Sequence, residues 1–161
     1  MSFRIGQGYD IHQIAPNKTL FLGGVKIPVL ENWGLLGHSD ADVLLHAVID
    51  AVLGALALGD IGQWFPDTDE KWRGADSKIL LQAVLRDPRV RPWKLVNLDC
   101  SIIAEDPKLA PYIKTIRSSL AVLFNVDAGC ISVKAKTNEH LDAVGRKEAM
   151  MAQAVVLLNH A

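Results

Sequence analysis

Two short motifs carry side chains whose types and spacing could bind a metal ion. Asp10 and His12 stand two residues apart in a segment that alternates like a strand, so both would point to the same side of an extended backbone. His46 lies in a mostly apolar run that predicts a helix. One carboxylate and two imidazoles suit a tetrahedral zinc ion with one open position, which is typical of catalytic zinc. The same ligands could hold Fe(II), and ordinary core or surface histidines are the alternative.

The polar residues of the apolar run form a narrow stripe. Ser39, Asp42, His46 and Asp50 recur at helical spacing and therefore share one face of the predicted helix. Ser39 is expected to be the N-cap, with Asp42 completing a capping-box-like start, and the helix is expected to end near Gly59. The other faces are apolar, so the helix should be buried and the stripe should face water, a partner or a metal. A plain solvated face is the alternative, although the stripe lacks lysine, glutamate and arginine.

Composition favours one globular domain with its own core. The chain has 161 residues, of which 50% are hydrophobic and 22% charged, and a net charge of −1. This balance favours neither a nucleic-acid partner nor a membrane surface, and the run 43–58 is short and interrupted for a membrane span. Cys100 and Cys130 are expected to be reduced core residues. With no signal-peptide pattern at the N-terminus, we expect a cytoplasmic protein.

Periodicity outlines the remaining elements. A strand that begins at Phe3 and runs toward His12 is followed by a hairpin around Gly23 and Gly24. The run Met150–Leu158 fits either a helix or a strand. Strands and helices mix throughout, which predicts an α/β or α+β fold with one layer of helices on a sheet. Further strands are expected at 95–104 and 131–136, helices at 76–85 and 109–123, and loops at 28–37 and 60–74.

Several motifs, taken in order, resemble one enzyme family. The chain is similar to the 2-C-methyl-D-erythritol 2,4-cyclodiphosphate synthases of non-mevalonate isoprenoid biosynthesis, and the similarity covers nearly the whole sequence. The segments that carry it are Gly8–His12, Leu22–Val25, His38–His46, Leu58–Gly62, Phe65–Asp69, Gly74–Ser77, Ile103–Lys108, Lys134–Glu139 and Gly145–Arg146.

This resemblance implies a fold, an assembly and a reaction. The fold would be a single catalytic domain over residues 1–161, with a mixed four-stranded sheet, helices packed on one face and the C-terminal run as a strand. The assembly would be a homotrimer with active sites between subunits. The 2-phosphate of 4-diphosphocytidyl-2-C-methyl-D-erythritol 2-phosphate would attack the β-phosphate within the same molecule. The products would be 2-C-methyl-D-erythritol 2,4-cyclodiphosphate and CMP.

The resemblance also assigns roles to residues. Asp10, His12 and His46 would bind zinc, and Glu139 would bind a second metal ion, Mg²⁺ or Mn²⁺, together with the substrate diphosphate. His38 and Thr137 would be catalytic and stabilise the transition state. Asp42 and Asp50 are given no such role: we expect them either to support the site from behind or to be polar residues of the helix stripe. Substrate contacts are implied for Asp10, His12, His38, Ser39, Asp60, Ile61, Gly62, Phe65, Pro66, Asp67, Thr68, Asp69, Ala104, Glu105, Asp106, Pro107, Lys108, Leu109, Ala110, Lys136, Thr137, Asn138, Glu139, Ala143 and Arg146.

Two positions depart from the family pattern, and two other functions compete with it. Lys136 stands where many members have threonine, and Ala143 where many have phenylalanine in the central cavity of the trimer. A metallophosphoesterase also opens with an Asp-x-His motif, but it needs a downstream Gly-Asn-His motif that this chain lacks. A non-enzymatic trimer built around zinc would need a closed site of four ligands, and the pattern supplies three.

Overall fold

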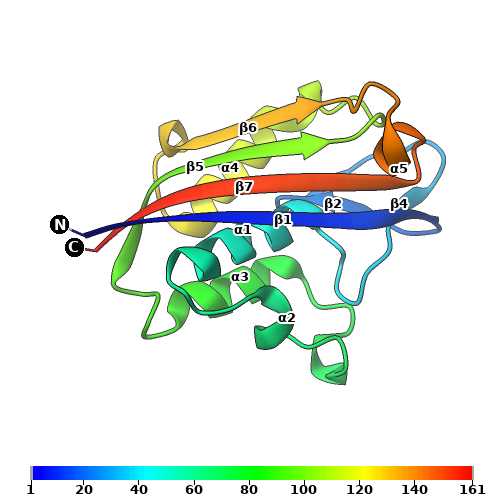
Figure 1. The fold of residues 1–161 in the computed structure, drawn as a ribbon. Helices are drawn as coiled ribbons and strands as arrows, with labels where there is room; N and C mark the ends of the chain where they lie inside the picture. Colours follow the sequence, from blue (N-terminus) through cyan, green and yellow to red (C-terminus); the bar gives the residue numbers. More distant parts are fainter. Residues whose placement is uncertain (1, 161) are drawn as a thin grey trace.

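A long first strand pairs with the C-terminal strand in the interior of the sheet. The computed structural model describes residues 2–160, in which β1 (Ser2–Pro16) pairs along nearly its whole length with β7 (Ala149–His160) (Figure 1). The strand order is β4-β1-β7-β5-β6, with β5 at Trp93–Ile103 and β6 at Ile131–Lys136. The β5–β6 pair is parallel, whereas β7 is antiparallel to both of its neighbours. The C-terminal run is therefore a strand, which pattern alone left open.

The expected four strands are a wrong count, because the sheet has five. The additional strand, β4 (Trp33–Leu35), lies inside the segment 28–37 that was expected to be a loop. It has only three residues and pairs with the last residues of β1, Ile14–Pro16. Such a short strand has no alternation to detect, so only its pairing with β1 defines it.

The hairpin prediction is confirmed, and it forms a separate two-stranded sheet. β2 (Leu20–Leu22) and β3 (Val25–Ile27) are antiparallel around Gly23 and Gly24. Both glycines have positive φ, at 61° and 75°, a conformation that glycine adopts without a Cβ clash.

Three longer helices contribute to one core on the same face of the sheet. They are α1 (Val43–Ala55), α3 (Ser77–Arg86) and α4 (Ile113–Phe124), and their buried residues cluster with the inward-facing residues of β5 and β7. The segment 60–74 is not structureless, because it contains α2 (Ile61–Trp64) and a 3₁₀ turn (Glu70–Trp72). Further short helices are a 3₁₀ turn at Ala110–Tyr112, another at Ala128–Cys130, and α5 (Asp142–Gly145).

The N-cap of α1 is Asp42, so the prediction of Ser39 is wrong. Ala41 has a φ of 57°, a left-handed conformation that stops the helix from extending back to Ser39. One oxygen of the Asp42 carboxylate accepts hydrogen bonds from the N–H groups of Leu45 and Gly23, both at 2.9 Å. The other oxygen accepts from Gly24 N–H at 2.6 Å. This buried carboxylate is therefore compensated by backbone donors and ties the hairpin to the start of α1.

Helix α1 lies unusually close to β1 because two residues of the strand have no side chain. A Cβ at Gly6 would come within 1.9 Å of the Ala51 carbonyl oxygen, and a Cβ at Gly8 within 1.9 Å of the Ala47 carbonyl oxygen. Within residues 2–160, no helix is long and apolar enough to cross a membrane.

The opposite face of the β1–β7 pair carries exposed apolar side chains in the single chain, with Gln7 and Gln153 among them. On β1, Phe3, Ile5, Tyr9 and Ile11 point away from α1 and have exposed fractions of 54%, 71%, 46% and 41%. Val155 on the neighbouring strand β7 is 39% exposed. We call these five residues the apolar sheet face. Several large apolar side chains exposed on one face of a sheet are typical of an interaction surface.

We expect Gly8→Ala to destabilise the protein by about 1–3 kcal/mol or more, because the added methyl would meet backbone rather than a flexible side chain. Urea unfolding at one fixed protein concentration measures the change. Gly54→Ala in α1 is the matched control, since the nearest atom to its added Cβ is the Gln7 carbonyl oxygen at 3.7 Å. The control should be as stable as the parent or more so. Equal stability of Gly8→Ala and the parent protein would contradict the close approach.

Candidate active site

Asp10, His12 and His46 come together as predicted. The alternation of β1 points Asp10 and His12 toward α1, and α1 contributes His46. Asp10 Oδ2 lies 2.9 Å from His12 Nε2 and 3.0 Å from His46 Nδ1, and the two ring nitrogens are 3.0 Å apart. The three potential ligand atoms all lie within 4.8 Å of one another. One carboxylate oxygen and two imidazole nitrogens converging in this way are a donor set that fits a metal ion such as zinc.

The electrostatics of this cluster favour a bound positive charge. Burial alone would raise the pKa of Asp10, but hydrogen bonds and charge interactions with His12 and His46 outweigh it and hold that pKa well below its usual range. Burial lowers the pKa of His46, whereas the Asp10 carboxylate raises it by more. An ionised Asp10 therefore attracts either a proton on the imidazole or a cation in its place.

A second set of hydrogen bonds orients the His46 ring from behind. Ser77 Oγ lies 2.5 Å from Asp40 Oδ1 and donates to it, because a carboxylate only accepts. His46 Nε2 lies 3.0 Å from Ser77 Oγ and 3.0 Å from Ser39 Oγ. Because the Ser77 hydroxyl proton is directed to Asp40, Ser77 Oγ can accept a hydrogen bond from His46 Nε2–H, and Nδ1 is then the ring nitrogen available to a metal ion in place of a proton. Such outer partners fix the tautomer of a ligating histidine.

Sequence reasoning missed Asp40 and Ser77 as members of the site. Both lie in motifs that carried the family resemblance, at His38–His46 and Gly74–Ser77, but nothing in their spacing links them. Ser77 is fully buried in the first turn of α3, where its N–H also donates to Asp40.

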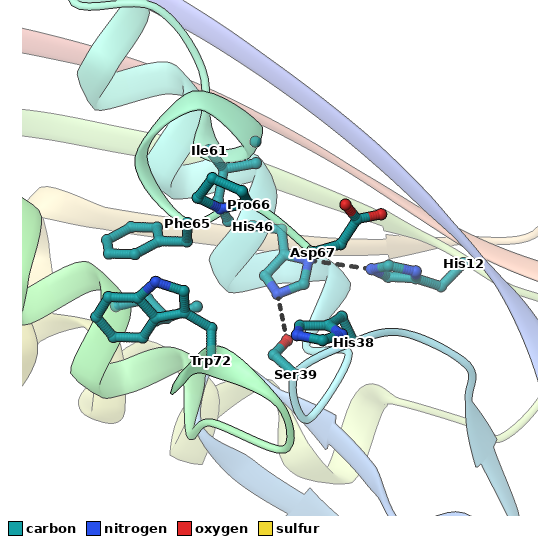
Figure 2. Close-up of a pocket in the computed structure, with 11 residues that line it drawn as sticks. His12, His38, Ser39, His46, Ile61, Phe65, Pro66, Asp67 and Trp72 are labelled. Carbon is teal, nitrogen blue, oxygen red and sulfur yellow. Dashed lines mark hydrogen bonds between the residues drawn. The ribbon is translucent and has the colours of Figure 1, made fainter. Parts of the chain in front are cut away.

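The cluster lies at one side of a pocket of about 390 Å³. Figure 2 shows His12, His38 and His46 on one side and the rings of Phe65 and Trp72 on the other. The Phe65 and Trp72 rings meet edge to face with centroids 4.9 Å apart. Residues expected to contact substrate that line the pocket are His12, His38, Ser39, Ile61, Gly62, Phe65, Pro66 and Asp67, and Trp72 and Leu80 are additional lining residues that the sequence did not predict.

The wall of the pocket around α2 is held by two aspartates. Asp60 is the N-cap of α2 and accepts a hydrogen bond from Gln63 N–H at 2.9 Å. Asp50, one turn beyond His46 on α1, accepts from Ile61 N–H at 2.7 Å. Of the two roles expected for Asp50, this hydrogen bond favours support of the pocket wall. Asp69 caps the following 3₁₀ turn, and its carbonyl oxygen lies 3.3 Å from His38 Nε2, while Thr68 precedes it in the same connection.

The remaining expected residues form a second group away from this pocket. The segment Ala104–Ala110 follows β5. Lys136 is the last residue of β6, and Thr137–Glu139 begin the loop after it, where Thr137 Oγ1 donates to Glu139 Oε1 at 2.9 Å. The segment residues Glu105, Asp106, Pro107 and Lys108 line a different cavity of about 580 Å³. Ala143 packs in a small cluster with Ile103, Val144 and Ala149, and Arg146 pairs with Glu148.

The separation of the two groups follows from the strand order. β7 lies between β1 and β5, and β6 lies beyond β5. The loop after β6 is therefore three strand spacings, about 14 Å, from the strand that carries Asp10 and His12. Within the described part of one chain, neither Thr137 nor Glu139 is among the residues that line the pocket with the histidine cluster.

Comparison with known proteins agrees with this fold. Residues 3–159 match the YgbB family. The 2-C-methyl-D-erythritol 2,4-cyclodiphosphate synthase of Nostoc sp. is 55% identical over 98% of this chain and 94% of its own length. The structure of Plasmodium falciparum IspF in a CDP complex superposes with a TM-score of 0.83 at 38% identity, covering 99% of this chain and 97% of that chain. The bifunctional IspDF of Campylobacter jejuni superposes with a TM-score of 0.93 at 39% identity, covering 99% of this chain and 43% of that one.

Fold and site together define a small α/β protein of the synthase class, with a carboxylate and two histidines gathered at one side of a pocket. More particularly, the chain belongs to the YgbB family, the family of the 2-C-methyl-D-erythritol 2,4-cyclodiphosphate synthases.

We expect His46→Ala to lose the bound metal ion while keeping its fold, because one of three converging ligands is removed. Elemental analysis of the purified protein and circular dichroism measure the two properties.

Ser77→Ala should keep the ligands but weaken metal affinity by about 10–100-fold, because it frees the His46 ring.

The matched control is Ser118→Ala, whose hydroxyl donates to the Lys114 carbonyl oxygen on the exposed side of α4. Its metal content should equal that of the parent. A parental metal content in His46→Ala would show that the cluster is not a metal site.

Proposed function

We propose that this protein converts 4-diphosphocytidyl-2-C-methyl-D-erythritol 2-phosphate to 2-C-methyl-D-erythritol 2,4-cyclodiphosphate and CMP. It would act as a metal-dependent phosphorus–oxygen lyase in isoprenoid biosynthesis. The 2-phosphate oxygen forms a bond to the β-phosphorus, and the bond from that phosphorus to the CMP oxygen breaks. The observation that carries the proposal is the convergence of Asp10, His12 and His46 beside a pocket, in a chain that belongs to the synthase family.

The donor set supports zinc at the histidine cluster. The pKa of Asp10 is held low, and His46 Nδ1 lies 3.0 Å from Asp10 Oδ2, so the three ligand atoms already face one another and a metal ion could replace the proton between them. Glu139, an oxygen ligand in a polar loop, is the proposed contact for Mg²⁺ or Mn²⁺, which prefer carboxylates and substrate phosphates. When bound, these ions would supply Lewis acidity and neutralise the charge of the phosphates.

The protein's own residues would position the substrate and balance its charge. Phosphoryl transfer depends on positioning and electrostatic stabilisation more than on covalent chemistry. His38 lies in the pocket beside the cluster and can donate to a phosphate oxygen. Thr137 can donate its hydroxyl to the phosphate under attack, and the Asp60 carboxylate can accept hydrogen bonds from the erythritol hydroxyls.

A cytidine subsite is proposed for the segment Ala104–Ala110. The Plasmodium falciparum relative is solved as a CDP complex, which supports a cytidine-diphosphate-linked ligand. The backbone of this segment can read the base, and Lys108 can neutralise phosphate. Lys136 and Arg146 would add positive charge, which matters because the chain as a whole has a net charge of only −1.

We further propose a homotrimer with active sites between subunits. Two features support it: the proposed site residues fall into two separated groups, and the apolar sheet face is uncovered in the single chain. Packing that face against neighbouring copies would bury it and could bring Thr137 and Glu139 of one copy to the histidine cluster of another. A cytoplasmic location is also proposed, in agreement with two free cysteines.

Supplying the cytidylated 2-phosphate substrate with Mg²⁺ should yield CMP and the cyclic diphosphate, which phosphorus NMR resolves. Glu139→Gln should lower kcat about 10²–10³-fold, on the scale of losing one charge-stabilising partner at the reacting phosphate. Added Mg²⁺ or Mn²⁺ should restore only part of the activity, and zinc content should stay unchanged.

Glu70→Gln is the control for this prediction, because the Glu70 side chain is exposed and forms an ion pair with Arg73. It should behave like the parent. Release of inorganic phosphate without a cyclic product would indicate a phosphoesterase instead, and an unchanged Mg²⁺ response in Glu139→Gln would place the second metal elsewhere.

Sedimentation analysis at micromolar concentration should give a stable trimer. Ile5→Glu puts a charge in the apolar sheet face and should weaken the assembly, because burying an unpaired charge is unfavourable. Val122→Glu is the matched control, since Val122 is 79% exposed on α4, away from that face, and it should remain trimeric. A parent protein that sediments as a monomer, or an Ile5→Glu trimer as stable as the control, would refute this arrangement.

A further inference from the structure

The ends of β5 and β6 place two proposed substrate segments side by side. The two strands are parallel, so their carboxyl ends lie at the same edge of the sheet (Figure 1). Just beyond the paired residues, Ala104 N–H donates to the Lys136 carbonyl oxygen at 2.9 Å. The Ala104–Ala110 segment and the loop Thr137–His140 therefore leave the sheet next to each other.

Glu105 connects the two segments through its side chain. Its carboxylate is only 5% exposed, although glutamate normally stays in water. Oε1 accepts hydrogen bonds from Asn138 N–H at 3.0 Å and from His140 N–H at 3.2 Å. Backbone N–H groups that converge in a turn form a concavity that binds an anion. Here the anion is the protein's own carboxylate, and the two donors flank Glu139.

The loop that Glu105 contacts has a backbone conformation that requires support. Glu139 and His140 have φ angles of 51° and 62°, in the left-handed region that residues other than glycine seldom occupy. Such conformations persist where surrounding contacts hold them. One contact is Gly145, where an added Cβ would come within 2.1 Å of the His140 carbonyl carbon. Asn138 and Leu141 also exchange two hydrogen bonds within the loop. The contact from outside the loop that uses its N–H groups is the pair of hydrogen bonds to Glu105, whose Oε2 also lies 3.6 Å from His140 Nδ1.

The conformation of this loop decides where Glu139 and Thr137 point. Within it, the Thr137 hydroxyl donates to Glu139 Oε1 at 2.9 Å, so the two proposed functional groups are oriented together. If the Asn138 and His140 N–H groups lost their acceptor, the left-handed residues could relax and both groups would turn. Side chains held loosely by even about 1 Å can lower a catalysed rate about 10²-fold.

We infer that Glu105 is a positioning residue whose carboxylate holds the Thr137–His140 loop in the conformation that presents Glu139 and Thr137 to the substrate phosphates. Its side chain is thus directed to the loop and not to the substrate. The inference rests on the proposed function for the roles of Glu139 and Thr137. The hydrogen bonds that carry it belong to the structure alone.

Two substitutions test the inference. Glu105→Gln keeps an acceptor oxygen in place, whereas Glu105→Leu has a similar volume and no acceptor. We expect Glu105→Leu to lower kcat by at least about tenfold with little change in KM, and Glu105→Gln to stay within about threefold of the parent. Zinc content should be unchanged in both, because Asp10, His12 and His46 are not touched. Equal kcat in all three proteins, or a rise in KM shared by both variants, would overturn the inference.

Amide hydrogen exchange provides a readout that does not depend on activity. In Glu105→Leu, the Asn138 and His140 amides should exchange at least about tenfold faster than in the parent, with the β6 amides unchanged. Glu105→Gln should retain most of the protection. Unprotected Asn138 and His140 amides in the parent protein would overturn the inference even if Glu105→Leu did not fold. A parent protein that releases no CMP would contradict the proposed function. The exchange result would still test separately whether Glu105 holds the Thr137–His140 loop.

Discussion

The close contact between α1 and β1 is the constraint on which the histidine cluster depends. Gly6 and Gly8 remove the side chains that would otherwise hold the helix away from the strand, and the carbonyl groups of Ala47 and Ala51 occupy that space. Asp10 and His12 follow Gly6 and Gly8 on the same face of β1, next to the point where His46 projects from α1. Ligand atoms on two rigid elements then converge without long flexible side chains, which keeps the entropy lost on ordering them small.

The N-terminal ends of α1 and α3 are held in place by aspartate carboxylates that accept hydrogen bonds from backbone N–H groups. Asp42 holds Gly23, Gly24 and Leu45, and Asp40 holds Ser77, which in turn contacts His46. The hairpin, both helices and the cluster are thereby linked by short hydrogen bonds. Because hydrogen bonds from backbone N–H groups to a buried carboxylate are directional, they orient these elements as well as stabilising them.

The other half of the proposed site depends on the parallel pair β5 and β6. Parallel strands end at the same edge, so segments more than thirty positions apart in the sequence, around Glu105 and Glu139, become neighbours. Within one chain, strand β7 lies between the β5–β6 pair and β1. The proposed site residues of a single copy therefore fall into two separated groups, and the uncovered apolar sheet face on β1 and β7 supports the proposal that copies complete one another.

The sequence by itself predicted those helices, strands and turns that depend on the residue pattern within the segment. The alternation of residues 131–136, the glycine pair of the hairpin and the apolar spacing of 109–123 each predicted an element close to the observed one. The Asp-x-His pair and His46 were also identified from residue types, since only a few side chains bind metal and their spacing fits a strand and a helix. Family resemblance, more than periodicity, assigned the reaction and the substrate contacts.

Tertiary structure alone decided the features that depend on a distant partner. β4 is a strand only because it pairs with β1, and β7 is a strand because it has neighbours on both sides to complete its hydrogen bonds. Asp42 replaced Ser39 as the N-cap because Ala41 adopts a left-handed conformation that local capping preferences do not reveal. Asp40, Ser77 and the Glu105 carboxylate acquire their roles from groups more than thirty residues away. Local sequence encodes which backbone and side-chain groups need partners, whereas the packed fold determines which partners they find.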